Sequence, residues 1–162
     1  MEQKQRNSVE VPCGLMREIV AYAEQDYPRE SCGFIVGPAS SGFLLSRVIC
    51  CRNAQDVFHK KDPENFTRTS REAYFMDPAE LFRIHKELRE EAEAIRIIYH
   101  SHIDGNAAFS KEDIRLAAPD GEPLFPGVGY LIIPVNRKKG DKAKLFFWKD
   151  DQKGFVECSL NY

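Results

Sequence analysis

The chain has 162 residues, of which 43% are hydrophobic and 30% charged, with a formal net charge of -2. These proportions are typical of a globular protein that folds as one domain. The sequence contains no long run of like charges and no apolar run of membrane-spanning length, which argues against nucleic acid and membranes as partners.

The polar start MEQKQRNSVE lacks the apolar core of a signal peptide, so we expect a cytoplasmic protein. We expect residues 1–10 to be a flexible N-terminus and residues 11–162 to fold as the single domain. The cysteines are odd in number and show no CxxC spacing, which indicates reduced and mostly buried thiols. They are Cys13, Cys32, Cys50, Cys51 and Cys158.

The first part of the domain predicts a helix followed by a β-hairpin. The helix starts around Pro12, which suits a first helical turn, and ends before Pro28. Its apolar stripe consists of Leu15, Ile19 and Tyr22 or Ala23. Residues 31–37 (SCGFIVG) and 43–51 (FLLSRVICC) are the predicted strands, and the PASSG between them is a turn signal.

The middle of the chain predicts a long connection and a second helix. Residues 53–70 are polar and irregular, so we expect a loop of the length that often carries function, and residues 71–76 are expected to add a short strand. The helix should then run to about Ala94. Its start has an N-cap, a first-turn proline and a capping-box acid, namely Asp77, Pro78 and Glu80. We interpret His85 on this helix as a partly buried packing residue and His59 in the loop as solvated, and neither as a metal ligand.

A third strand leads into a pair of histidines. Residues 95–99 form a β-branched and aromatic run of strand length, and His100 and His102 follow directly. Residues two apart in a strand point to the same side, so both imidazoles can bind one metal ion, whereas Ser101 points away.

A serine and an aspartate follow at the start of the next helix. After a turn at residues 104–106, Ser110 is the expected N-cap and Asp113 lies three residues later. On its own this SxxD pattern indicates helix capping. Together with the two histidines it indicates a metal site, because two imidazoles and one carboxylate leave the fourth position of a tetrahedral zinc ion open, as catalytic zinc sites do.

The remainder of the chain completes a predicted α/β fold. A second long loop at residues 119–127 precedes strands at 127–135, 144–148 and 154–160. We therefore expect a single-domain mixed, curved β-sheet with hairpins, packed against two or three helices.

Other metal proteins use related ligands. Amidohydrolase barrels also begin with an HxH strand but need roughly 250 residues, and zinc deaminases need HxE and PCxxC patterns that this sequence lacks. Non-haem iron oxygenases bind iron through two histidines and a carboxylate, so ligand type alone leaves Fe(II) open.

Two segments of the sequence carry a family resemblance: HSHIDG with the following FS and SxxD, and ESCGFIVG at residues 30–37. They resemble the JAMM (MPN-plus) metallopeptidases. The resemblance extends from about residue 16 to residue 160 and is strongest to the small bacterial members. It implies the JAMM/MPN fold and one zinc ion per chain, bound by His100, His102 and Asp113. Ile103 departs from the family pattern, which usually has proline after the second histidine, and this difference concerns the shape of the loop.

The resemblance also implies roles for two further residues. Composition alone would make Glu30 a solvated polar residue, but its position matches the family's general base, which takes a proton from a zinc-activated water. Ser110 would donate a hydrogen bond to the developing oxyanion.

The resemblance implies a peptidase or isopeptidase that cleaves an amide bond at the C-terminal tail of a ubiquitin-like or sulfur-carrier β-grasp protein. Loops 53–70 and 119–127 would form the walls of a channel for an extended tail. A non-catalytic MPN-type scaffold or protein-binding module is the alternative, although such scaffolds typically lack the metal ligands. A homodimer, the identity of the carrier, and the choice between an isopeptide and a linear peptide bond stay open.

Overall fold

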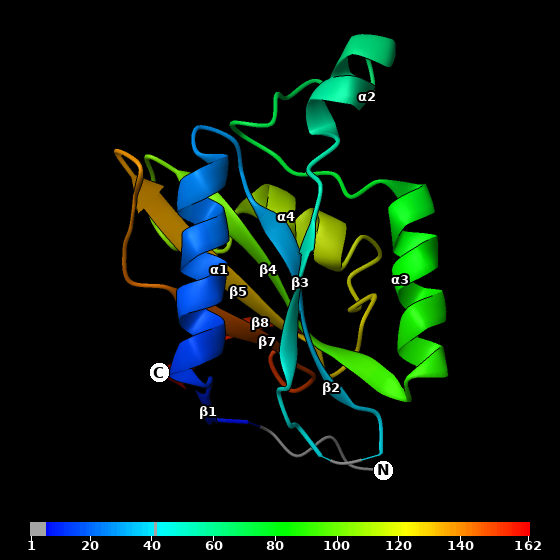
Figure 1. The fold of residues 1–162 in the computed structure, drawn as a ribbon, viewed down its shortest axis with the longest axis vertical. Coiled ribbons are helices and arrows are strands. Elements are labelled where there is room, and N and C mark those ends of the chain that lie inside the picture. The colour runs from blue at the N-terminus through cyan, green and yellow to red at the C-terminus, as the bar shows by residue number, and fades with distance from the viewer. Residues whose placement is uncertain (1–5, 41) are drawn as a thin grey trace.

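The computed structural model describes residues 6–40 and 42–162 (Figure 1). Within these ranges the helices are α1 (Cys13–Asp26), α2 (Gln55–Lys61), α3 (Pro78–Glu90) and α4 (Lys111–Ala117). The strands are β1 (Ser8–Glu10), β2 (Cys32–Pro38), β3 (Arg47–Cys51), β4 (Glu93–Ile103), β5 (Gly129–Asn136), β6 (Lys139–Gly140), β7 (Lys144–Lys149) and β8 (Gly154–Asn161). None of these helices is both long enough and apolar enough to cross a membrane.

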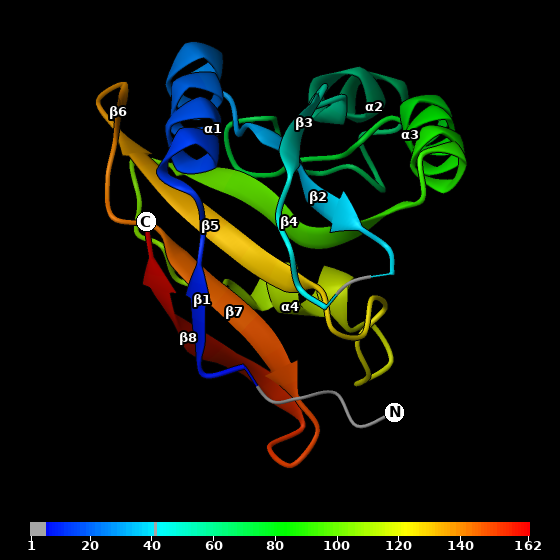
Figure 2. The ribbon, with the colours of Figure 1, turned by 60° about the horizontal axis from the view of Figure 1, so that its bottom comes forward.

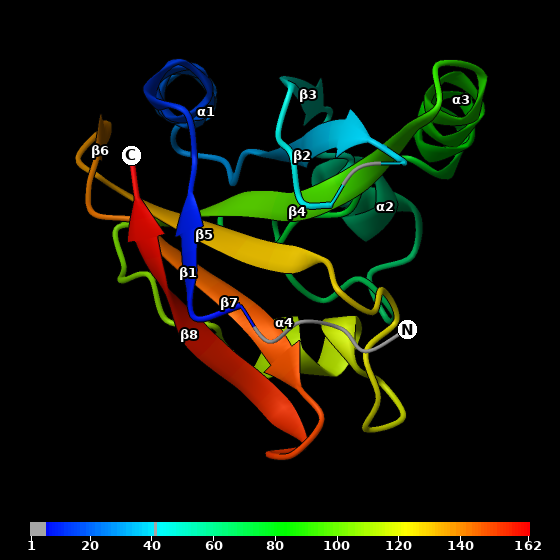
Figure 3. The ribbon, with the colours of Figure 1, turned by 90° about the horizontal axis from the view of Figure 1, so that it is seen from below.

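The described strands join into one mixed sheet in the order β1-β8-β7-β5-β4-β2-β3, with β6 paired to β5. β1 is parallel to β8 and β4 is parallel to β5, whereas the other pairs are antiparallel. Figures 2 and 3 show that the sheet is curved and that α1 and α4 lie on opposite sides of β4 and β5. The predicted α/β class, with a mixed curved sheet and the hairpins β2–β3 and β7–β8, is confirmed.

Side chains of β4 alternate between two hydrophobic cores. Tyr99 belongs to the core that α1 covers, whereas Ile98 packs in the second core with apolar residues of α3 and α4. Because successive residues of a strand point to opposite faces, His100 and His102 continue the face of Ile98. The strand therefore presents both imidazoles on the side where α4 begins.

The segment before β2 continues the antiparallel pairing of β2 with β4, since the backbone N–H of Ser101 donates to the carbonyl of Ser31 at 2.9 Å. Gly33 pairs with Tyr99, and a Cβ at position 33 would lie 2.7 Å from the Tyr99 ring, so only glycine fits here. The backbone N–H of Ser31 donates a hydrogen bond to Ser101 Oγ at 2.7 Å, which confirms that Ser101 points away from the histidines. These contacts bring Glu30, the preceding residue, beside the histidine-bearing strand.

The N-terminal prediction is partly wrong. Residues 1–5 of the expected flexible segment lie outside the described residues, but Ser8–Glu10 forms β1 in parallel register with Ser159–Asn161. Val9 is buried in the α1-side core, which gives the strand an apolar anchor. A three-residue strand that pairs with the far end of the chain leaves no local pattern in the sequence.

The long connection contains a helix that the sequence analysis did not predict. Helix α2 lies within the expected loop 53–70, and its Phe58 packs against Phe66 and Phe75 with ring centroids 5.2 and 4.7 Å apart. The expected strand at 71–76 is reduced to an isolated bridge between Asn53 and Met76.

Helix α3 is shorter than predicted. It ends at Glu90 rather than near Ala94, because Ala92 adopts a left-handed backbone conformation (φ 54°) and β4 begins at Glu93. Asp77 caps the helix as expected, but the Glu80 carboxylate accepts a hydrogen bond from the backbone of Arg52 rather than closing a capping box.

The two histidines outside the motif also differ from expectation. His85 is exposed rather than partly buried, because it lies one position beyond the buried stripe residue Ile84. His59 lies on α2, where its Nδ1 is hydrogen-bonded to the carbonyl of Phe66. Neither side chain lines the pocket at the candidate site.

The cysteines are free thiols, as predicted. Three are buried and two are exposed. The buried ones are Cys32, Cys51 and Cys158, and the exposed ones are Cys13 and Cys50.

Candidate metal centre

The two strand histidines and the helix aspartate converge on one point. His100 Nε2 lies 3.1 Å from His102 Nε2 and 3.2 Å from one carboxylate oxygen of Asp113. The other Asp113 oxygen lies 3.4 Å from His102 Nε2. His100 is fully buried, and the Asp113 side chain is 12% exposed. The three side chains that the sequence analysis selected could therefore hold a metal ion together.

Neighbouring groups orient the two imidazoles. His102 Nδ1 lies 2.9 Å from the carbonyl oxygen of Asn106, which can only accept a hydrogen bond, so Nδ1 carries the proton and Nε2 is free to bind a metal. Tyr74 stacks on His100 with ring centroids 4.6 Å apart. Two imidazole nitrogens and a carboxylate that meet in this way form a donor set that suits a divalent cation with an open coordination position.

The electrostatics of Asp113 and His102 favour a positive charge beside them, whereas burial lowers the pKa of His100 and keeps that imidazole neutral. Burial alone would raise the pKa of Asp113, but hydrogen bonds to His100 and His102 hold it well below its usual range. Burial opposes a charge on His102, yet its hydrogen bonds to Asp113 and Asn106 raise its pKa. The carboxylate thus remains ionised beside the imidazoles, and a bound cation would compete with the proton on His102.

Ser110 and Asp113 form the predicted helix cap. Ser110 Oγ accepts a hydrogen bond from the backbone N–H of Asp113 at 3.1 Å, and an Asp113 carboxylate oxygen accepts one from the backbone N–H of Ser110 at 2.9 Å. This reciprocal capping box fixes the Asp113 carboxylate toward the histidines. The Ser110 hydroxyl accepts in the cap, so its own proton stays available for a group in the pocket that it lines.

Glu30 enters the same pocket from the segment before β2. Its backbone N–H donates to Ser70 O at 2.7 Å and its carbonyl accepts from Asn53 Nδ2 at 2.9 Å, so the main chain is held on both sides. The residue is only 6% exposed, and this burial raises its pKa to about 8. The solvated state expected from composition is therefore wrong for Glu30.

The raised pKa predicts a pH effect on the stability of the metal-free protein. The folded state retains the Glu30 proton up to about pH 8, whereas the unfolded chain releases it near pH 4.3, so this contribution to stability is present at low pH and is lost as the pH rises between these values. Glu30→Gln should remove the loss and stabilise the chelator-treated protein at pH 9 by on the order of 5 kcal/mol relative to the parent, because each unit of pKa shift corresponds to about 1.4 kcal/mol.

Urea unfolding at pH 5 and pH 9 checks this expectation. Glu72→Gln is the matched control, because Glu72 lines the same pocket but is exposed. The same pH dependence in the parent and in Glu30→Gln would show that the Glu30 carboxyl titrates like a solvated group.

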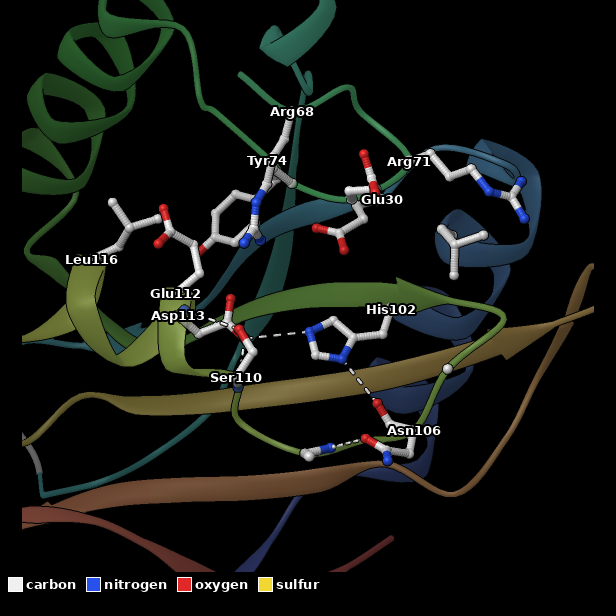
Figure 4. A pocket seen from close by; sticks show the side chains of 15 residues that line it. Glu30, Arg68, Arg71, Tyr74, His102, Asn106, Ser110, Glu112, Asp113 and Leu116 are labelled. Atoms are coloured by element: carbon white, nitrogen blue, oxygen red, sulfur yellow. Dashed lines mark hydrogen bonds and ion pairs between the residues drawn. The ribbon is translucent and has the colours of Figure 1, made fainter. Parts of the chain in front are cut away.

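The pocket in front of the candidate ligands has a volume of about 380 Å³ (Figure 4). The segment after α2 supplies much of its wall through Arg68, Arg71 and Tyr74. Loops 53–70 and 119–127 were predicted to form the walls of the site. Arg68 of the first loop lines the pocket, whereas no residue of 119–127 does, so that half of the prediction is wrong for this pocket. The individual residues Arg71 and Tyr74 were missed, because nothing in their local pattern distinguishes a pocket wall from a short strand.

Ile103 does not disturb the approach of the ligands. It continues β4 in register with Val135 and packs against the α1-side core. The loop shape therefore accommodates isoleucine, and His102 still reaches Asp113.

A curved mixed sheet that presents two histidines to the mouth of a helix carrying an aspartate defines a single-domain α/β protein with a candidate mononuclear metal centre. The chain belongs to the prokaryotic homologs of the JAB domain, whose family model matches residues 12–150. The recognition of a JAMM-type chain from its motifs is thereby confirmed.

The relatives of this chain include proteins named for a peptidase activity. The CysO-cysteine peptidase of Mycobacterium tuberculosis is 29% identical over 119 residues, which cover 74% of this chain and 68% of that protein. A probable TtuB-protein conjugate cleaving protease of Thermus thermophilus is 33% identical over 107 residues, covering 66% of this chain and 62% of that protein.

Solved structures agree with the fold. A protein from Desulfitobacterium hafniense superimposes with a TM-score of 0.65 at 28% identity, covering 93% of this chain and 90% of the other. A protein from Salinibacter ruber gives 0.59 at 22% identity, covering 94% and 89%, and at this identity the likeness concerns the fold alone.

Proposed function

We propose that the protein is a zinc-dependent peptidase that cleaves an amide bond at the C-terminal tail of a ubiquitin-like or sulfur-carrier protein. The observation that carries this proposal is the convergence of His100, His102 and Asp113 at a pocket that also contains Glu30 and Ser110. The two relatives named above are a peptidase for a CysO-cysteine adduct and a probable protease for TtuB conjugates, which supports a substrate of this class.

Each residue of the pocket has a separate role in the proposed reaction. A zinc ion held by His100, His102 and Asp113 would supply a Lewis acid that acidifies water and polarises the scissile carbonyl. Glu30 accepts the proton of the attacking water, since a nearby dication favours the ionised form of a carboxyl group whose pKa burial has raised. Ser110 donates its free hydroxyl proton to the carbonyl oxygen as that oxygen gains negative charge.

The reaction consumes one water molecule. The oxygen of the water forms a bond to the carbonyl carbon, the C–N bond breaks, and Glu30 returns the proton to the leaving amine. The products are the carrier with a free C-terminal carboxylate and the released amine. No side-chain nucleophile is needed, and the pKa of Cys32, raised by burial, disfavours a thiolate near the site.

Replacing one ligand tests the metal assignment. We expect the purified parent to contain about one zinc ion per chain and His102→Ala to lose most of it on dialysis against a chelator, because two remaining ligands hold zinc weakly. His85→Ala is the matched control, since His85 is exposed on α3 away from the pocket. Elemental analysis for zinc and iron together, with cleavage of a carrier adduct followed by mass spectrometry, reports both metal identity and activity.

The possible outcomes separate the two classes of function. An unchanged metal content in His102→Ala would contradict the ligand assignment. A metal-free parent that cleaves no adduct would favour the scaffold alternative, and one iron ion per chain would favour oxygenase-type chemistry.

A further inference from the structure

The pocket contains two arginines that differ in their partners. Arg71 Nη2 forms an ion pair with an Asp104 carboxylate oxygen at 2.7 Å. The guanidinium of Arg68 has no hydrogen bond or ion pair with any residue in the described parts of the chain, although Arg68 lines the pocket beside Glu30 and Asp113. Figure 4 shows its side chain extending from the loop into the pocket next to Tyr74.

The main chain that carries Arg68 is firmly held. The buried Gln55 of α2 donates from Nε2 to Arg68 O at 2.8 Å. Two residues later, Ser70 is buried and donates from both its backbone and its hydroxyl to the Asp56 carboxylate, at 2.8 and 2.6 Å. Helix α2 thus positions the start of the Arg68 side chain at the rim of the site.

The acidic side chains that share the pocket with Arg68 form no ion pair with it in the described parts of the chain: Glu72 is exposed, and Glu112 and Asp113 have other partners. Glu112 accepts two hydrogen bonds from Arg115, at 3.0 and 2.8 Å, and Asp113 faces the two histidines. Burial is the main cause of the raised pKa of Glu30, and the positive charge of Arg68 only partly offsets it. The planar fork of Arg68 is therefore free to bind a carboxylate that enters with a ligand, in the bidentate geometry that guanidinium groups favour.

Only some substrates of the proposed class have a free carboxylate close to the scissile bond. When a single amino acid is attached through its α-amino group, its free carboxylate lies on the carbon next to the scissile nitrogen, close to the reacting carbonyl. In a linear protein extension that position is a neutral amide. In an isopeptide it is a methylene group of the lysine side chain.

Resting on the proposed peptidase function, we propose that Arg68 binds the α-carboxylate of the leaving group, so that the preferred substrate is a carrier extended by one amino acid. Arg68 is then a specificity-determining residue that selects single-residue adducts over isopeptide conjugates. The pocket, at about 380 Å³, is of a size that holds one residue and the end of a tail.

A matched pair of ligands tests the carboxylate contact. The probes are a β-grasp sulfur-carrier protein that ends in Gly-Gly, extended by alanine, and the same adduct as alanine amide. We expect the zinc-loaded parent to cleave the acid about 10- to 100-fold more efficiently in kcat/KM than the amide, the range typical of a hydrogen bond between charged groups. Arg68→Gln should lose this preference by acting more slowly on the acid alone, with unchanged zinc content and melting temperature.

Binding supplies a readout that does not depend on turnover. Calorimetric affinities of the two adducts for zinc-loaded Glu30→Gln, with and without Arg68→Gln, should show the same preference and its loss. Arg83→Gln, which changes an exposed arginine on α3 outside the pocket, is the control and should keep the preference.

The outcomes distinguish this inference from the function on which it rests. Equal discrimination between acid and amide in the parent and in Arg68→Gln, by cleavage or by binding, overturns the inference and leaves the peptidase in place. Cleavage of neither adduct by the zinc-loaded parent overturns the proposed function and this inference with it. Faster cleavage of a lysine isopeptide conjugate than of the alanine adduct also overturns the inference.

Discussion

Glu30→Gln is expected to lower kcat by roughly 10²–10⁴-fold, the contribution of a general base in other enzymes. Glutamine has nearly the same size as glutamate, but its amide does not accept the proton of the attacking water or return it to the leaving amine. The carboxylate of Glu30 lies in the pocket of the metal centre and is buried, whereas the residue itself makes its hydrogen bonds to Ser70 and Asn53 through its backbone. The substitution should therefore leave the fold and the zinc content intact.

Three measurements on the one variant isolate the chemical role. Zinc content should stay near the parental value, melting temperature should be no lower, and KM should change little compared with kcat. Glu72→Gln provides the matched control, because Glu72 lines the pocket but is exposed, and it should retain nearly full turnover. Near-parental kcat in Glu30→Gln would leave Glu30 as a buried carboxyl group without a part in the reaction.

The candidate ligands could be predicted from the sequence because their geometry is local. The two-residue repeat of a strand puts His100 and His102 on one face, and the capping box places Asp113 at the first turn of the next helix. Each of these rules acts over a few residues. The only long-range step, the approach of α4 to β4, follows from the short connection between them.

The pocket wall and the ends of the sheet were harder to predict because they depend on tertiary contacts. Helix α2 has only seven residues, too few for a clear apolar period, and its Phe58 is held by aromatic rings later in the connection. Strand β1 is defined by its pairing with β8 at the other end of the chain. Arg68 likewise gains its position from Gln55 and Ser70, contacts that no sequence periodicity reports.

Ser110 has two proposed roles, helix capping and stabilisation of the oxyanion, and the two roles predict different effects of substitution. As an N-cap, its Oγ accepts the N–H of Asp113 at 3.1 Å, and Ser110→Ala should therefore cost about 0.5–2 kcal/mol of stability. The second half of the capping box, from the Ser110 N–H to the Asp113 carboxylate at 2.9 Å, uses the backbone and survives any substitution except proline. Asp113 should consequently keep its orientation toward the histidines in Ser110 variants.

Ser110→Gly separates capping from catalysis, because glycine is a tolerable N-cap, costing a few tenths of a kcal/mol, yet has no hydroxyl donor. If the Ser110 hydroxyl stabilises the oxyanion, this variant should bind zinc, melt near the parental temperature and lose roughly 10²–10³-fold in kcat. Ser110→Thr, which keeps both the cap and the donor, should retain more turnover than the glycine variant. Parental kcat in a stable, zinc-loaded Ser110→Gly protein would restrict the hydroxyl to helix capping, and the oxyanion would then depend on the metal and on other donors of the pocket.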